Sequence, residues 1–145
     1  IAMTRFSATD SLADVAIAKA KVKEGIYKIQ INDVKLRLKM LLNNEMDAML
    51  LPQPQATTAL LHNHKEIADS AFLRTHVGVI AFRKKAMEDN RRKQQLKSFV
   101  KAYNEACDSI NKYGISSYAD VIKKYTEADN KTIKALPKLN YKHAK

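Results

Sequence analysis

Short apolar runs alternate with helix-like patterns over the first half of the chain, and this alternation constrains the fold more than any other feature. Strand-like runs occupy residues 1–5, 26–31 and 46–51, where β-branched or continuously apolar residues are bounded by turn residues. Between these runs, apolar residues recur at the three- and four-residue spacing of a helix face. Strands that alternate with helices predict an α/β fold, with a mostly parallel sheet flanked by helices.

The second half of the chain has a different pattern and is expected to be helical. Residues 66–70 and 76–82 are interpreted as two further strands, and helical stripes follow from residue 83 onward. We therefore divide the chain into an α/β region over residues 1–75, a hinge-type crossing strand over residues 76–82 and a C-terminal helical section over residues 83–145. Cys107 falls on an apolar helical stripe, which indicates a core residue and not a nucleophile.

The chain is strongly basic, with 26 Lys and Arg residues against 15 Asp and Glu residues and a formal net charge of +11. Such an excess suits nucleic acid, an anionic membrane surface or an anionic ligand. The basic residues are densest over residues 83–101, and a solvated basic surface is the favoured interpretation. Nucleic-acid binding is disfavoured, because Phe99 and Tyr103 lie on a stripe expected to be buried, where they cannot stack on bases.

Several kinds of site are excluded or disfavoured by the residues themselves. Glycine occurs only at positions 25, 78 and 114, so neither common glycine-rich phosphate loop can be built. His62 and His64 lack the further ligands of a recognisable metal motif, and no metal or cofactor is expected. The single cysteine allows no intramolecular disulfide.

The chain carries no secretory signal pattern and no apolar run long enough to cross a membrane. Its first residue, Ile1, already lies inside an expected strand. We therefore expect the chain to be a fragment of a longer protein, and truncation that exposes an apolar face would favour a homodimer.

The turns that follow the predicted strands hold the candidate ligand-binding residues. In open α/β sheets, ligands bind beyond the carboxyl ends of the strands, so the turns "RFSATD", "INDVK" and "PQPQATT" are expected at one edge. The candidates are Arg5, Ser7, Thr9, Asp10, Gln53 and Gln55.

All of these residues except Arg5 also have a purely structural interpretation. Ser7 and Asp10 have the spacing of a capping box, and Thr9 can also act as a cap. Gln53 and Gln55 can be turn residues that precede a helix. The two interpretations remain open at each turn taken alone.

The stretch "VKLRLKMLLNNEMDAMLLPQPQATTAL" resembles the second lobe of periplasmic solute-binding proteins of ABC importers. The closest group is the class that includes sulfonate, nitrate and thiamine-precursor binders. "IAMTRFSATDSLADVAIAKA" resembles the segment that opens this lobe, and "HVGVIAFRKKAMEDN" resembles a later hinge-crossing strand and helix start. Gln53 stands where the family usually has a carboxylate, and Phe6 stands where glycine is common.

This resemblance implies a type 2 periplasmic-binding-protein-like lobe that is not an enzyme. The implied partners are a small polar or anionic solute, of sulfonate, oxyanion or pyrimidine type, and an ABC permease. The implied location is the periplasm or cell envelope, with a lipid anchor in some full-length members. It also implies that Ser7, Thr9 and Gln53 face the ligand.

Two other classes of function stay open beside the solute-binding protein. One is an enzyme built on the same two-lobed fold, which would need His62 or His64 within hydrogen-bonding reach of Ser7 or Thr9. The other is a basic helical nucleic-acid-binding domain, whose affinity would fall steeply with salt.

Overall fold

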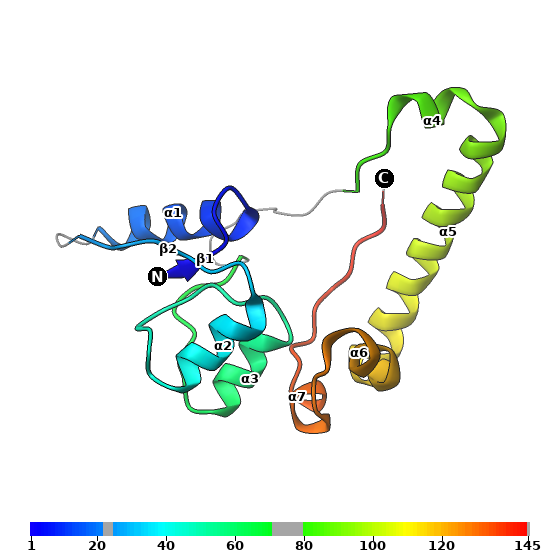
Figure 1. Cartoon of the computed structure of the whole chain (residues 1–145). Coiled ribbons are helices and arrows are strands. Elements are labelled where there is room, and N and C mark those ends of the chain that lie inside the picture. The colour runs from blue at the N-terminus through cyan, green and yellow to red at the C-terminus, as the bar shows by residue number, and fades with distance from the viewer. Residues whose placement is uncertain (22–24, 71–79, 145) are drawn as a thin grey trace. The chain divides into compact units, whose positions relative to one another are not determined.

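The structure is a computed structural model that describes residues 1–21, 25–70 and 80–144. It consists of two compact units, Ile1–Gly78 and Val79–Lys145 (Figure 1). Residues 76–79 of the crossing strand expected from the sequence lie outside the described residues, and residues 80–82 form neither helix nor strand. None of the described helices is both long enough and apolar enough to span a lipid bilayer.

Three parallel segments organise the N-terminal unit. β1 (Ala2–Met3) pairs in parallel with β2 (Ile29–Gln30) on one side. On its other side, Ala2 forms a single parallel bridge with the third segment, residues 48–50. The N–H of Ala2 donates to the carbonyl of Ala48, and the carbonyl of Ala2 accepts from the N–H of Leu50, both at 3.0 Å. β1 therefore lies in the middle, and the carboxyl ends of all three segments lie at the same edge.

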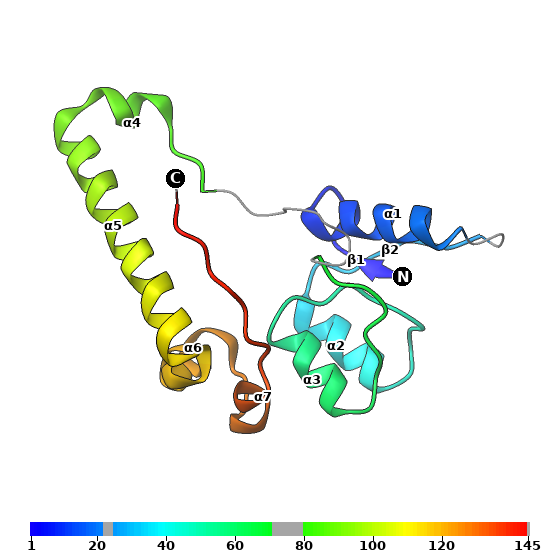
Figure 2. The same ribbon diagram turned by 180° about the vertical axis from the view of Figure 1, so that it is seen from behind.

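Helices cover both sides of these segments. α1 (Ala8–Ala20) lies on one side, and α2 (Val34–Leu42) and α3 (Gln55–Leu61) lie on the other, as both views show (Figures 1 and 2). The carboxylate of Asp33 caps α2 by accepting hydrogen bonds from the N–H groups of Lys35 and Leu36, the second and third residues of the helix. The buried apolar residues of this unit are three alanines, Ala2, Ala13 and Ala59, and the larger Met3.

The fold class predicted from the sequence is wrong. Of the described residues, 57% are helical, and their sheet has two strands of two residues each. This is not a type 2 periplasmic-binding lobe with a large parallel sheet. The apolar content of a strand is not enough to make it pair. The chain turns away directly after Met3, β2 stays exposed to solvent, and residues 66–70 form no strand.

The C-terminal unit is built around one long helix. Its elements are α4 (Lys84–Glu88), α5 (Asn90–Tyr113), the short 3₁₀ helix η1 (Ile115–Tyr118), α6 (Ala119–Thr126) and α7 (Asn130–Lys134). α5 ends at Gly114, whose φ of 82° is one that residues with a side chain rarely adopt. Cys107 is 3% exposed, so its predicted place in the core is confirmed.

A buried arginine ties α2 to the third parallel segment. Arg37 is only 2% exposed, and its Nη1 donates to the carbonyl of Leu50 at 2.7 Å. Its Nε is buried and has no hydrogen-bond partner in the described part of the chain. Burial lowers the pKa of Arg37, and the negative charge of Asp33 partly opposes this effect. The guanidinium nevertheless stays protonated, because the ordinary pKa of arginine is very high.

We expect Arg37→Ala to lower the free energy of unfolding of the N-terminal unit by about 2–4 kcal/mol, because it removes a charge-assisted hydrogen bond and leaves a cavity. Urea denaturation followed by circular dichroism measures this change. The control is Lys39→Ala on the same helix, where the side chain is exposed and the change should stay within about 0.5 kcal/mol. Equal effects of the two substitutions would contradict the role given to Arg37.

Candidate functional site

The candidate site lies at the carboxyl ends of the three parallel segments. β1 is followed by residues 4–7, β2 by residues 31–33 and the third segment by residues 51–54. Arg5, Ser7, Thr9 and Asp10 belong to the first turn and the start of α1, and Gln53 belongs to the third turn. Because β1 pairs with the third segment, the turn that bears Arg5 and the turn that bears Gln53 follow neighbouring segments at one edge.

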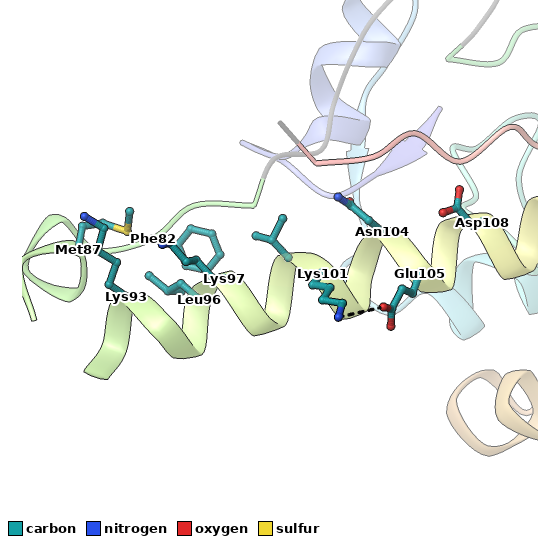
Figure 3. A pocket seen from close by; sticks show the side chains of 10 residues that line it. Phe82, Met87, Lys93, Leu96, Lys97, Lys101, Asn104, Glu105 and Asp108 are labelled. Atoms are coloured by element: carbon teal, nitrogen blue, oxygen red, sulfur yellow. Dashed lines mark ion pairs between the residues drawn. The ribbon is translucent and has the colours of Figure 1, made fainter. Parts of the chain in front are cut away.

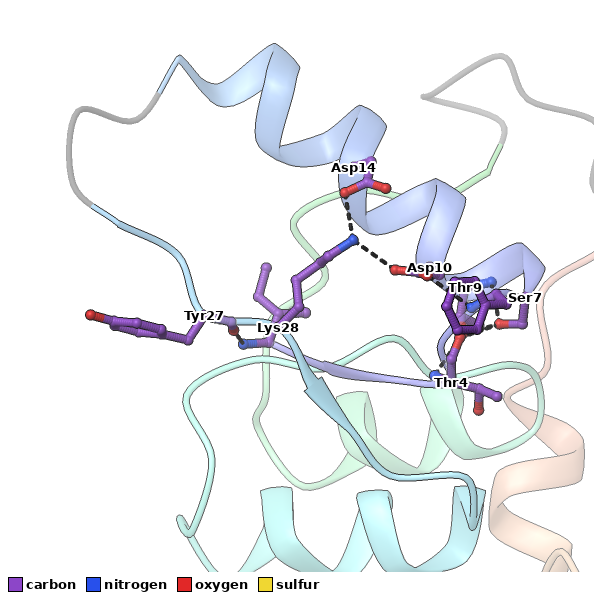
Figure 4. Close-up of polar contacts among 9 residues, drawn as sticks. Thr4, Ser7, Thr9, Asp10, Asp14, Tyr27 and Lys28 are labelled. Carbon is purple, nitrogen blue, oxygen red and sulfur yellow. Dashed lines mark hydrogen bonds and ion pairs between the residues drawn. The ribbon is translucent and has the colours of Figure 1, made fainter.

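The hydroxyl groups of the first turn bind one another and the backbone (Figure 4). Ser7 Oγ donates to the carbonyl of Thr4 at 2.5 Å and lies 2.8 Å from Thr9 Oγ1. Thr9 Oγ1 accepts from the N–H of Thr4 at 3.1 Å, and Ser7 Oγ accepts from the N–H of Thr9 at 3.2 Å. In this structure the two hydroxyls hold the turn, and a ligand would reach them only by replacing one of these bonds.

Asp10 is fully engaged by its neighbours (Figure 4). Its Oδ1 accepts from Lys28 Nζ at 2.7 Å, and its Oδ2 accepts from the N–H of Phe6 at 2.8 Å. Lys28 also binds Asp14 at 2.7 Å. Asp10 accepts from the N–H of Phe6 and not from that of Ser7. The capping box expected from the sequence is therefore shifted by one residue. The carboxylate of Asp10 positions the turn and has little capacity left for a ligand.

The ion pairs shift the pKa of both partners. The hydrogen bond from Lys28, followed by that from the backbone of Phe6, lowers the pKa of Asp10 below its ordinary value of 3.8. The hydrogen bonds to Asp10 and Asp14 raise the pKa of Lys28. Both groups are therefore charged at neutral pH, and Lys28 is shared between the carboxylates of Asp10 and Asp14 beside the edge.

The tip of the first turn faces solvent. Arg5 is exposed, and Phe6 is 97% exposed with a φ of 56°. This left-handed backbone costs a residue with a side chain about 1–2 kcal/mol, so glycine would fit this position with less strain. The sequence indicated Phe6 only as a departure from the pattern of the resembling family and did not indicate its exposure.

Gln53 caps α3 through its side chain. Its Oε1 accepts from Thr57 Oγ1 at 2.7 Å and from the N–H of Thr57 at 3.2 Å, while Thr57 itself is 3% exposed. Because a backbone N–H donates to this oxygen, the amide nitrogen of Gln53 is the group that points away. That nitrogen makes no hydrogen bond within the described residues, and the side chain is exposed. Gln55 is half-buried at the first position of α3.

The edge therefore presents hydrogen-bond donors. Arg5 is a permanent cation, and the Gln53 amide can donate two hydrogen bonds, whereas a carboxylate at that position could only accept. The nearby carboxylate of Asp10 is already paired with Lys28. Such a set of groups suits the oxygen atoms of an anion better than a cation or a metal.

Neither a metal site nor a histidine-activated hydroxyl is assembled in the described part of the chain. No group of three His, Cys, Asp or Glu residues there is placed to hold a metal ion. His62 Nδ1 lies 2.8 Å from the carbonyl of Thr58, and among the described residues neither His62 nor His64 hydrogen-bonds to Ser7 or Thr9.

A second polar surface lies on the C-terminal unit. Its basic residues on and beside α4 and α5 are Arg83, Lys84, Lys85, Arg91, Arg92, Lys93, Lys97 and Lys101. Phe99 is 49% exposed and meets Phe82 edge to face, with ring centroids 6.1 Å apart. The prediction that Phe99 is buried is therefore wrong, and this reason for disfavouring nucleic acid does not hold for Phe99.

The Asp10–Lys28 pair makes the stability of the N-terminal unit depend on pH. The folded-state pKa of Asp10 is lowered, so its contribution is complete above the ordinary value of 3.8 and is lost as pH falls through the folded-state pKa. We expect Asp10→Asn to be less stable than the native chain at pH 7, and the difference to shrink as the pH falls from 3.8 through the lower folded-state pKa of Asp10. Urea denaturation across this pH range measures it, with the exposed Asp47→Asn as the control. A difference that stays constant with pH would refute the pairing.

Comparison with known proteins assigns no family to the chain. No protein-family model, no curated protein and no solved structure matches it. The resemblance to solute-binding proteins therefore stays a prediction, and the function is argued from the contacts described above.

Proposed function

We propose that the N-terminal unit binds a small anionic solute at its strand-end edge, as the binding component of an ABC-type importer that passes the solute to a membrane permease. The observation that carries this proposal is the parallel order of the three segments. This order sets Arg5 and the donor amide of Gln53 on turns at one edge, while the carboxylate of Asp10 is paired with Lys28.

The donor groups favour one of the solute types that the resemblance implies. A sulfonate or another oxyanion presents oxygen atoms that accept from a guanidinium and from an amide N–H. A pyrimidine needs an alternation of donors and acceptors, and the acceptor oxygen of Gln53 is already used by Thr57. We therefore place sulfonates and oxyanions ahead of pyrimidines.

This role requires no catalysis, cofactor or metal from the chain. The protein would act in the periplasm or at the cell envelope, and its partners would be the solute and the permease. One edge supplies only one wall of a cleft, so we expect the chain to bind its solute weakly, with Kd on the order of 1 mM.

Nuclear magnetic resonance titration of the ¹⁵N-labelled chain tests the proposal. The ligands are methanesulfonate, sulfate, nitrate and 4-amino-5-hydroxymethyl-2-methylpyrimidine. We expect one of the anions to shift the amide resonances of residues 4–9 and 51–57 and the side-chain NH₂ of Gln53. The shifts should saturate, and the pyrimidine should produce smaller ones.

Two substitutions separate a site from general attraction by a basic protein. Arg5→Gln should weaken anion binding by at least about fivefold, because one direct ionic contact is lost. Lys39→Gln removes the same charge from the exposed side of α2 and should leave binding unchanged. Equal weakening by both variants, or shifts spread evenly over exposed lysines, would refute the site.

A further inference from the structure

Residues 141–144, which follow α7 in the chain, lie along α5 as an extended segment that we call the strap. The side-chain amide of Asn111 forms two hydrogen bonds with the backbone of Tyr141, donating to its carbonyl at 2.8 Å and accepting from its N–H at 2.9 Å. Asn104 Oδ1 accepts from the N–H of Ala144 at 2.9 Å. Helix α5 therefore binds an extended chain mainly through backbone atoms.

The distance between the two contact positions on the helix matches the distance between their partners on the strap. Residues 104 and 111 are seven residues apart on a helix that rises about 1.5 Å per residue, which gives roughly 10 Å. Residues 141 and 144 are three steps apart in an extended chain of about 3.3 Å per residue, which also gives roughly 10 Å. The strap runs antiparallel to α5, and its direction leads toward the N-terminal half of that helix.

A groove of about 610 Å³ lies in that direction. Apolar side chains from Phe82, Met87, Leu96 and Val100 line it. Phe82, Met87 and Leu96 lie toward the start of α5 in Figure 3. At its other end the groove includes Asn104 and Asp108, which also bind the strap. The groove therefore continues an interface that already holds an extended chain.

Lysine side chains give this groove a basic rim between Lys93 and Lys101, while two carboxylates, Glu105 and Asp108, line its other end. Lys93, Lys97 and Lys101 recur every fourth residue and border it. Of these, Lys101 makes a long, exposed ion pair with Glu105 at 3.8 Å. Lys93 and Lys97 form no ion pair among the residues described. A partner that fills the groove would therefore need apolar groups for its floor and negative charges for its rim.

We propose that this groove of the C-terminal unit binds an extended peptide of a partner protein in which apolar and acidic residues alternate. Successive side chains of an extended chain point to opposite faces, so alternate residues can enter the apolar floor while the others meet the lysines. From Asn104 to Lys93 the helix rises about 16 Å, which corresponds to about five extended residues. This interaction is independent of the solute site.

Fluorescence anisotropy with the whole chain tests the proposal. The probe is a fluorescein-labelled hexapeptide of alternating leucine and aspartate. The comparison probes are a leucine–lysine hexapeptide, a serine–aspartate hexapeptide and an oligothymidylate of matched charge. We expect the leucine–aspartate peptide to bind at least about tenfold more tightly than each of the other three.

Matched charge reversals locate the binding. Lys97→Glu should weaken binding of the leucine–aspartate peptide about tenfold, because attraction is replaced by repulsion, whereas the exposed Lys123→Glu on α6 should not change it. Circular dichroism confirms that both variants keep their helices. Binding of the serine–aspartate peptide or the oligonucleotide as tight as that of the first peptide would overturn the proposal in favour of a general polyanion surface. Absence of binding up to about 1 mM would also overturn it.

Discussion

Ala2 forms backbone hydrogen bonds on which the whole N-terminal unit depends. Its N–H and carbonyl pair with residues 48 and 50, and it stands opposite Ile29 of β2. With so few residues paired, the sheet contributes little stability by itself, and the covering helices and Arg37 must hold its register. A slip of one residue would turn every side chain of β1 to the opposite face and move the first turn relative to the third.

Much of the helical structure could be predicted from the sequence, and the sheet could not. Asp33 marks where α2 begins, and Gly114 marks where α5 ends. Such caps can be recognised in a sequence because they lie within a few residues of the backbone N–H and carbonyl groups at the helix end. Strand length depends instead on a partner that is distant in sequence. The apolar run 46–51 predicted a full central strand, yet it meets β1 at a single bridge. Apolar character therefore predicted the position of this segment but not the extent of its pairing.

The site was predictable only in part, for similar reasons. The hydroxyls of the first turn and the capping by Gln53 involve residues no more than five apart, so sequence spacing could reveal them. The burial of Arg37 could not be predicted, because arginine is rarely buried and its acceptor lies on another segment. The contacts of Asn104 and Asn111 could not be predicted either, because their partners are backbone atoms that lie 30 or more residues away.

Because α5 binds the strap mainly through main-chain atoms, the strap can tolerate many amino-acid substitutions. Asn111 contacts the N–H and carbonyl of Tyr141, groups that almost every amino acid supplies. Apart from His143, whose ring lies 2.8 Å from Asp108, the strap can therefore change its side chains without losing these bonds, provided that proline does not remove the donor. Aspartate in place of Asn111 would keep the acceptor and lose the donor. The information that fixes this contact resides in the helix, so the two partners need not evolve together.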